Sequence, residues 1–174
     1  MANKSNKNSN QSSHKIPFPL ASLPAVLLPW YDREKRSLPW RDIVTPYRTW
    51  VSEIMLQQTR VQAVLPYFER FMAAAPDVPA LAELAEDRLL SLWQGLGYYS
   101  RARSLQRSAR VMVDQYGGCL PDTYSDLIQL PGIGDYTAGA ILSIAFNKAV
   151  PAVDGNVLRI AARLTARGEK ILEP

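Results

Sequence analysis

Apolar residues recur at helical spacing from Ala21 onward, and few segments show the strict alternation of apolar and polar residues that a half-buried strand would have. The pattern therefore predicts an all-α protein. Proline and glycine residues interrupt it often, so we expect short helices joined by short loops. The predicted helices span about residues 23–35, 47–58, 61–74, 87–93, 101–116, 125–130, 136–147 and 156–166.

Two of these helices differ in their patterns. The helix over 136–147 is apolar or small on nearly every side, including Ile144, which predicts a buried central helix. The helix over 156–166 has a single apolar face, so it needs a packing partner. That face consists of Val157, Ile160, Ala161 and Leu164, opposite Arg159 and Arg163.

Composition narrows the possible chemistry. The formal net charge of +4 favours a polyanionic partner. Cys119 is the only cysteine and His14 the only histidine, which excludes disulfides, a structural zinc site and Ser-His or Cys-His catalysis. Any catalysis therefore depends on carboxylates, Lys, Tyr or Ser. Residues 1–20 read as a disordered tail without a signal peptide, which predicts a cytoplasmic protein that is not secreted.

The segment Leu127–Leu142 has the pattern of a helix-hairpin-helix: a short apolar helix, a Pro-Gly-Ile-Gly turn and a helix of small residues. Gly132 and Gly134 are expected to allow a tight turn at positive φ, which aims backbone N–H groups at a phosphate oxygen. This predicts sequence-independent DNA binding. An ordinary corner between two helices is the alternative, since many Leu-Pro-Gly-x-Gly segments make one.

Two carboxylates are candidates for catalysis. Glu53 flanks an apolar stripe that includes Trp50, Ile54 and Gln58, so it can face a cleft, although a flanking glutamate is more often solvated. Asp154 precedes a helical pattern and is expected to cap that helix. The positive field of the helix N-terminus keeps such a carboxylate ionised, which suits stabilisation of a developing cation.

The segment Trp93–Arg103 combines glycines, tyrosines and arginines in a predicted loop and helix start. Glycine allows close approach to a DNA strand, an aromatic residue or leucine can wedge into a base stack, and arginine can bind phosphate. The same tyrosines and leucine would equally suit a core. The sequence leaves both interpretations open.

Five motifs in the same order resemble the A/G-specific adenine DNA glycosylases of the MutY family, over about residues 25–166. They are LPWR (38–41), SEIMLQQT (52–59), GLGYYSRAR (95–103), LPGIGDYTAGAIL (130–142) and AVDGNV (152–157).

The resemblance implies the fold of the endonuclease III superfamily, with a helical barrel lobe over 37–153 that contains the helix-hairpin-helix at 127–142. A second helical lobe would comprise the N-terminal helix at 21–36 and the segment 154–174, and would be incomplete.

The same resemblance implies roles for individual residues. Glu53 matches the catalytic acid, Asp154 the stabilising carboxylate and Tyr136 a tyrosine that assists both. Gln58, Thr59, Leu96 and Tyr98 match positions that contact or wedge beside 8-oxoguanine, whereas Trp40 and Arg41 would line the pocket for the extruded adenine.

The implied function is base excision repair: removal of adenine from A:8-oxoguanine or A:G mispairs in double-stranded DNA, by base flipping and acid catalysis. The implied protein is a monomer associated with a bacterial nucleoid. Full-length family members carry a 4Fe-4S cluster on four cysteines and a further C-terminal domain, and neither the cysteines nor that domain is present here. We therefore expect marginal stability and weak activity.

Two alternatives remain. A bifunctional glycosylase/lyase needs a lysine nucleophile, and Tyr136 stands where that lysine is expected. A non-catalytic helix-hairpin-helix fragment that binds DNA would have no need of Glu53 and Asp154.

Overall fold

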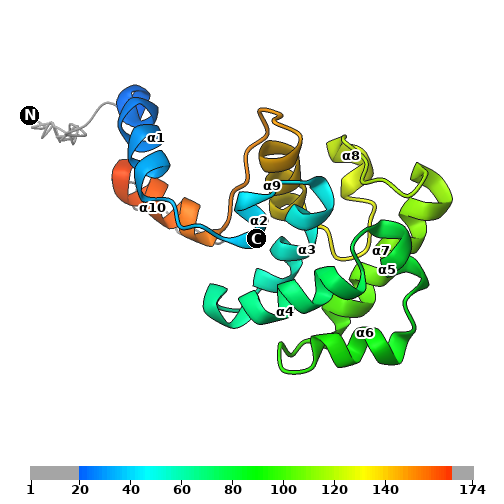
Figure 1. The fold of residues 1–174 in the computed structure, drawn as a ribbon. Coiled ribbons are helices and arrows are strands. Elements are labelled where there is room, and N and C mark those ends of the chain that lie inside the picture. The colour runs from blue at the N-terminus through cyan, green and yellow to red at the C-terminus, as the bar shows by residue number, and fades with distance from the viewer. Residues whose placement is uncertain (1–19, 166–174) are drawn as a thin grey trace, which may run out of the picture. The chain divides into compact units, whose positions relative to one another are not determined.

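A computed structural model describes residues 20–165, which contain ten α-helices, one short 3-10 helix and no strand (Figure 1). The prediction of an all-α protein is confirmed. The predicted N-terminal tail lies outside the described residues, apart from Leu20. The elements are η1 (Leu20–Ser22), α1 (Leu23–Glu34), α2 (Pro39–Asp42), α3 (Pro46–Leu56), α4 (Val61–Ala74), α5 (Val78–Glu83), α6 (Glu86–Trp93), α7 (Tyr99–Tyr116), α8 (Tyr124–Leu127), α9 (Asp135–Ala145) and α10 (Gly155–Thr165).

The chain divides into two compact units. The larger one comprises Arg36–Asp154 and therefore contains α2 to α9. The described part of the smaller one consists of η1 and α1, from the N-terminal segment, and α10.

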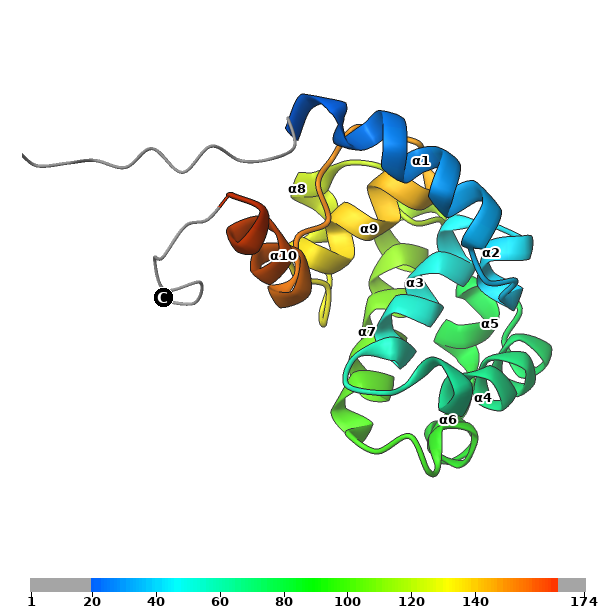
Figure 2. The same cartoon turned by 90° about the vertical axis from the view of Figure 1, so that its left-hand side faces the viewer.

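Helix α3 is at the centre of the larger unit, where it packs against α9, α4 and α7 (Figure 2). Its residues Trp50, Val51 and Met55 are completely buried. Helix α9 buries the six consecutive residues from Thr137 to Leu142, but Ile144 is 52% exposed. The prediction that this helix is buried on nearly every side is therefore wrong for its last turn.

The ends of these helices follow from local chemistry. Thr45 and Asp77 cap α3 and α5, where each side chain accepts a hydrogen bond from a backbone N–H of the first turn. Helices α2 and α5 were not among the predicted helices, because proline residues interrupt the helical pattern in these segments. Pro39 is the first residue of α2, a position where its missing N–H costs no helical hydrogen bond.

The smaller unit has no buried residue in α1 or α10. Trp30 of α1 is 51% exposed, and Ile160 and Leu164, on the predicted apolar face of α10, are 56% and 38% exposed. Across the described residues, every helix is too short or too polar to span a bilayer.

Candidate active site

Glu53 and Tyr136 come from α3 and α9, which pack against each other in the larger unit. Glu53 is half-buried on α3, between the buried residues Ser52 and Ile54. Tyr136 lies in the first turn of α9 and is 39% exposed. The Tyr136 hydroxyl lies close enough to the Glu53 carboxyl to act on its pKa as a hydrogen-bond donor. The packing of α3 on α9 therefore creates a carboxyl–phenol pair.

The environment favours the protonated form of both groups. Burial raises the pKa of Glu53, while the hydrogen bond from Tyr136 and the positive charge of Arg41 oppose this rise. Burial, the Glu53 charge and the Asp154 charge together raise the pKa of Tyr136 to about 12. Tyr136 therefore keeps its proton at neutral pH and serves as a hydrogen-bond donor.

Asp154 belongs to the same group, because its charge acts on Tyr136. The segment that leads to Asp154 crosses α9 at Gly139, where an added Cβ would lie 2.3 Å from the Pro151 carbonyl oxygen. Gly139 is one helical turn after Tyr136, so the two residues share a face. The absence of a side chain at position 139 therefore allows the segment to reach the Tyr136 end of α9. Sequence analysis missed this role.

The predicted helix-hairpin-helix consists of α8, the turn at 128–134 and α9, which contact each other. Gly132 has a φ of 82°, as predicted for a tight turn. Gly134 does not: its φ of −102° is open to any residue, and it is the N-cap of α9. The expectation of positive φ is therefore wrong at Gly134. The Ser108 hydroxyl on α7 donates a 2.8 Å hydrogen bond to the Pro131 carbonyl and anchors the turn.

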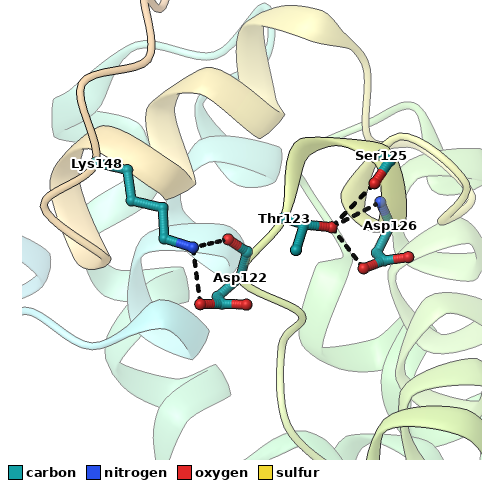
Figure 3. Close-up of polar contacts among 5 residues, drawn as sticks. All are labelled: Asp122, Thr123, Ser125, Asp126 and Lys148. Atoms are coloured by element: carbon teal, nitrogen blue, oxygen red, sulfur yellow. Dashed lines mark hydrogen bonds and ion pairs between the residues drawn. The ribbon is translucent and has the colours of Figure 1, made fainter.

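Contacts at the outer ends of the hairpin fix its two helices. Lys148, after α9, forms a 2.7 Å salt bridge with Asp122, before α8 (Figure 3). Thr123 caps α8, because its hydroxyl accepts a hydrogen bond from the Asp126 N–H (Figure 3). The Tyr124 hydroxyl donates to the Asp135 carboxylate at 2.8 Å and so links α8 to the start of α9.

Two loops of the larger unit carry the other predicted DNA contacts. Helix α3 ends at Leu56, so Gln58 is not part of a helical stripe as predicted; it is exposed in a turn, with a φ of 58°. Thr59 follows it and is half-buried. In the second loop, Tyr98 is 65% exposed, whereas Leu96 is only 7% exposed and packs in the core. In this structure Leu96 is therefore not placed to wedge into a base stack.

The structure separates the two residues that were predicted to line an adenine pocket. Trp40 is 6% exposed and packs edge-on against Phe68, with 5.1 Å between the ring centroids. It is a core residue, because the single turn of α2 directs its ring inward. Arg41 is exposed and lies close enough to Glu53 to influence its pKa. Only Arg41 therefore remains a candidate for contact with a bound base.

The residues of this chain do not provide a site for an iron–sulfur cluster. Such a cluster needs several cysteine thiolates, and Cys119 is the only cysteine and is exposed. Within residues 20–165, no three side chains of His, Cys, Asp or Glu are arranged to hold a metal ion.

Comparison with known sequences gives consistent matches. A family model for "HhH-GPD superfamily base excision DNA repair protein" matches residues 51–173. The chain is 50% identical over 151 residues to the adenine DNA glycosylase of Mus musculus. The aligned region covers 82% of this chain and 29% of the mouse protein. It is 44% identical over 139 residues to the adenine DNA glycosylase of Buchnera aphidicola subsp. Baizongia pistaciae (strain Bp), covering 79% and 40% respectively. The chain thus spans less than half the length of these relatives.

Solved structures with the same fold include a thermostable thymine-DNA glycosylase, with a TM-score of 0.75 and 27% identity over 80% of this chain and 65% of that one. A non-covalent endonuclease III–DNA complex matches with a TM-score of 0.73 and 20% identity over 88% and 73% of the two chains. The predicted fold of the endonuclease III superfamily is confirmed.

Proposed function

Because the chain belongs to the HhH-GPD superfamily of base excision DNA repair proteins, and within it to the adenine DNA glycosylase family, we propose that it excises adenine from DNA. The observation that carries this proposal is the grouping of Glu53, Tyr136 and Asp154 in the larger unit. One of its carboxyl groups is shifted toward the protonated form, as acid catalysis of base release requires.

In the proposed reaction the target adenine leaves the base stack, since no side chain can reach its N-glycosidic bond inside the duplex. Glu53 donates its proton to a ring nitrogen of the adenine. The bond from the sugar C1′ to the base then breaks, and its electron pair leaves with the protonated base. A water molecule adds to C1′ and loses a proton to Glu53, which restores the acid and leaves an abasic site.

Two further residues support this step. Ionised Asp154 stabilises the positive charge that develops on the sugar, as a carboxylate does in glycoside hydrolysis. Tyr136 remains protonated and orients Glu53 through its hydrogen bond. Arg41 contributes a positive charge near Glu53 and lowers its pKa, which limits how far burial raises it.

The proposed activity is monofunctional. A lyase reaction needs an unprotonated lysine amine beside the sugar. The larger unit contains a single lysine, Lys148, and its ammonium group is bonded to Asp122 rather than to the Glu53 group. This favours hydrolysis over Schiff-base formation.

For the substrate, we propose double-stranded DNA with adenine opposite 8-oxoguanine or guanine. The exposed residues Gln58 and Tyr98, with Thr59, would contact the base opposite the adenine. The turn at Gly132 and the N-terminus of α9 would bind a phosphate through backbone N–H groups, which needs no particular sequence. The names of the similar glycosylases support adenine as the excised base, and the DNA complex with the same fold supports DNA as the substrate.

The test is Glu53→Gln, which keeps the shape of the side chain but removes its acidic proton. We expect adenine release in single-turnover reactions to fall by roughly 10²–10⁴-fold, the usual contribution of a general acid. Binding of the mispaired duplex in a gel-shift titration should change little. Glu69→Gln, at an exposed position on α4, is the matched control and should behave as wild type.

Three outcomes would contradict the proposal. Release of adenine by the Glu53→Gln protein at the wild-type rate would remove Glu53 from the mechanism. A wild-type protein that binds the duplex but releases no adenine would favour the alternative of a DNA-binding module. Borohydride trapping of a covalent adduct would favour the lyase.

A further inference from the structure

Arg101 makes contacts that the proposed reaction does not use. It is the third residue of α7, and its guanidinium group reaches across to the end of α3. There its Nη1 donates to the carbonyl oxygens of Ile54 at 2.8 Å, Met55 at 3.1 Å and Gln57 at 2.6 Å. These carbonyls lie at or just beyond the helix end, where no backbone N–H of the helix remains to pair with them.

The second terminal nitrogen of the Arg101 guanidinium group contacts another loop. The Nη2 of Arg101 donates to the carbonyl oxygens of Leu96 and Gly97, each at 3.2 Å, and lies 3.5 Å from the Thr59 hydroxyl. The guanidinium also lies 5.5 Å from the Trp93 ring centroid and 5.7 Å from that of Tyr98. One side chain therefore joins the loop after α3 to the loop before α7.

This arrangement requires arginine. Its planar fork presents donors in several directions, whereas the ammonium group of lysine is a point charge with three donors. The partners are neutral carbonyls, and among the described residues Arg101 forms no salt bridge. Burial lowers the pKa of Arg101, which reflects the cost of removing its charge from water. Arg101 therefore joins the two loops with a partly buried positive charge that no acidic side chain within residues 20–165 neutralises.

Both loops hold a backbone conformation that side chains disfavour. Gln58 has a φ of 58° and Tyr98 a φ of 49°, and neither is a glycine. A residue in such a region is strained and persists only where its surroundings enforce that conformation. Arg101 donates hydrogen bonds to the carbonyl oxygens of Gln57 and Gly97, which directly precede these two strained residues in the chain.

We propose that Arg101 is a positioning residue that sets the spacing and the conformation of these two loops, so that their exposed side chains meet the same base pair. Arg101 itself does not touch DNA. This inference rests on the proposed function, because it assigns Gln58, Thr59 and Tyr98 to recognition of the base opposite the adenine. A cavity of about 100 Å³ next to Arg101 is also lined by Gly132, so the hairpin turn borders the same region.

The first test needs no DNA. In Arg101→Lys, amide hydrogen exchange at residues 57–60 and 95–99 should speed up by tenfold or more, a loss of about 1.4 kcal/mol of local protection. The matched control is Arg107→Lys on the same helix, an exposed residue that bonds to Ser104 one turn earlier. It should leave exchange in both loops unchanged. Equal exchange in the two variants would overturn the role of Arg101.

The second test measures recognition in the full chain. We expect Arg101→Lys to lose roughly tenfold of the preference for an A:8-oxoguanine duplex over an A:C duplex, the size of one lost base contact. Its rate of adenine release at saturating protein should stay within a few-fold of wild type. Arg107→Lys should keep the full preference, because Arg107 bonds to Ser104 of its own helix. Both variants retain the positive charge, so a difference between them does not come from a loss of charge.

The two tests separate the two possible failures. If exchange speeds up in Arg101→Lys but the preference for 8-oxoguanine is retained, the loops are joined by Arg101 but do not read the opposite base, and the inference is wrong. If the wild-type protein itself shows no preference between the duplexes, the proposed substrate is wrong, whatever the exchange experiment shows.

Discussion

Helices α9 and α10 both have apolar residues at helical spacing, but they lie in different surroundings. Helix α9, in the larger unit, buries six consecutive residues, whereas α10, in the smaller unit, buries none. The amphipathic pattern is clearer in α10, where one face is apolar and the opposite one carries arginines. An amphipathic pattern thus predicts that a helix forms, but it does not tell how completely its apolar face is covered.

The three residues of the site are held in place in different ways. Glu53 and Tyr136 lie on helices whose inner faces are buried against each other, so the core fixes the relative position of the two residues. Asp154 is the last residue of the larger unit and is held through the segment that crosses Gly139. The position of Asp154 therefore depends on this close backbone approach.

The largest expected effect concerns two tryptophans, one in each unit. Trp93 is fully buried in the core of the larger unit, and Trp30 of α1 is 51% exposed. Trp93→Ala should lower the free energy of unfolding by about 3–5 kcal/mol, the usual cost of emptying a large core site. Trp30→Ala should change it by less than about 0.5 kcal/mol. Denaturant titration measures both, and similar losses would show that α1 is packed in solution.

The next largest effect tests the crossing at Gly139. Gly139→Ala places a Cβ 2.3 Å from the Pro151 carbonyl oxygen, so the segment that leads to Asp154 must move. We expect the rate of adenine release to fall by roughly 10–100-fold, as for the loss of a supporting contact at a reactive site. DNA affinity should be retained. Single-turnover assays with gel-shift titrations measure the two quantities.

The control for this change is Ser143→Ala, one turn later on the same helix. The Ser143 hydroxyl bonds only to carbonyls of its own helix, at Gly139 and Ala140. Its removal should leave the release rate within about twofold, because such a hydrogen bond contributes little net stability. A rate for Gly139→Ala equal to that of Ser143→Ala would show that the segment tolerates the added carbon atom.

Much of the fold was predictable from local patterns. Helix α4 begins and ends at the predicted residues, because its apolar stripe is regular and uninterrupted by glycine. The short helices α2 and α5 were missed, since a proline at or near the first position of a helix resembles a break in the sequence.

The chemistry of the site was less predictable than the fold. The sequence indicates Glu53 and Asp154 as candidates, but their relation to Tyr136 depends on how α3 packs on α9. The roles of Gly139 and Arg101 depend on segments distant in the sequence that approach each other in space. Local spacing contains no signal for such approaches, and the same is true of the buried positions of Trp40 and Leu96.

A smaller effect is expected from the charge of Glu53 on stability. Burial raises its pKa in the folded protein, so the folded state binds the proton more tightly than the unfolded chain does. This contribution to stability is complete at pH values below the ordinary range of glutamate and is lost as the pH rises through the raised pKa. Glutamine does not ionise, so Glu53→Gln should have a higher Tm than wild type at neutral pH.

This difference should shrink as the pH falls toward the ordinary range of glutamate. Thermal unfolding at several pH values measures it, with Glu69→Gln on the exposed side of α4 as the control. A Glu53→Gln protein that is less stable than wild type at neutral pH would show that the ionised carboxylate is stabilised by its neighbours. In that case the charge of Arg41 and the hydrogen bond from Tyr136 would outweigh the burial.

The smallest expected effect lies on the apolar face of α10. Ile160 is 56% exposed, so its replacement by serine removes few contacts, and Ile160→Ser should change the free energy of unfolding by less than about 0.5 kcal/mol. The completely buried Ile141 on α9 provides the matched comparison. Ile141→Ser leaves a cavity and buries a hydroxyl, which together cost several times more, about 3 kcal/mol or above.

Denaturant titration of the two variants gives the ratio of the two losses directly. A loss of about 2 kcal/mol or more for Ile160→Ser, which is the cost of exposing a buried isoleucine, would mean that this face of α10 is covered in solution. The contrast between the two units would then be one of position in the fold and not of packing.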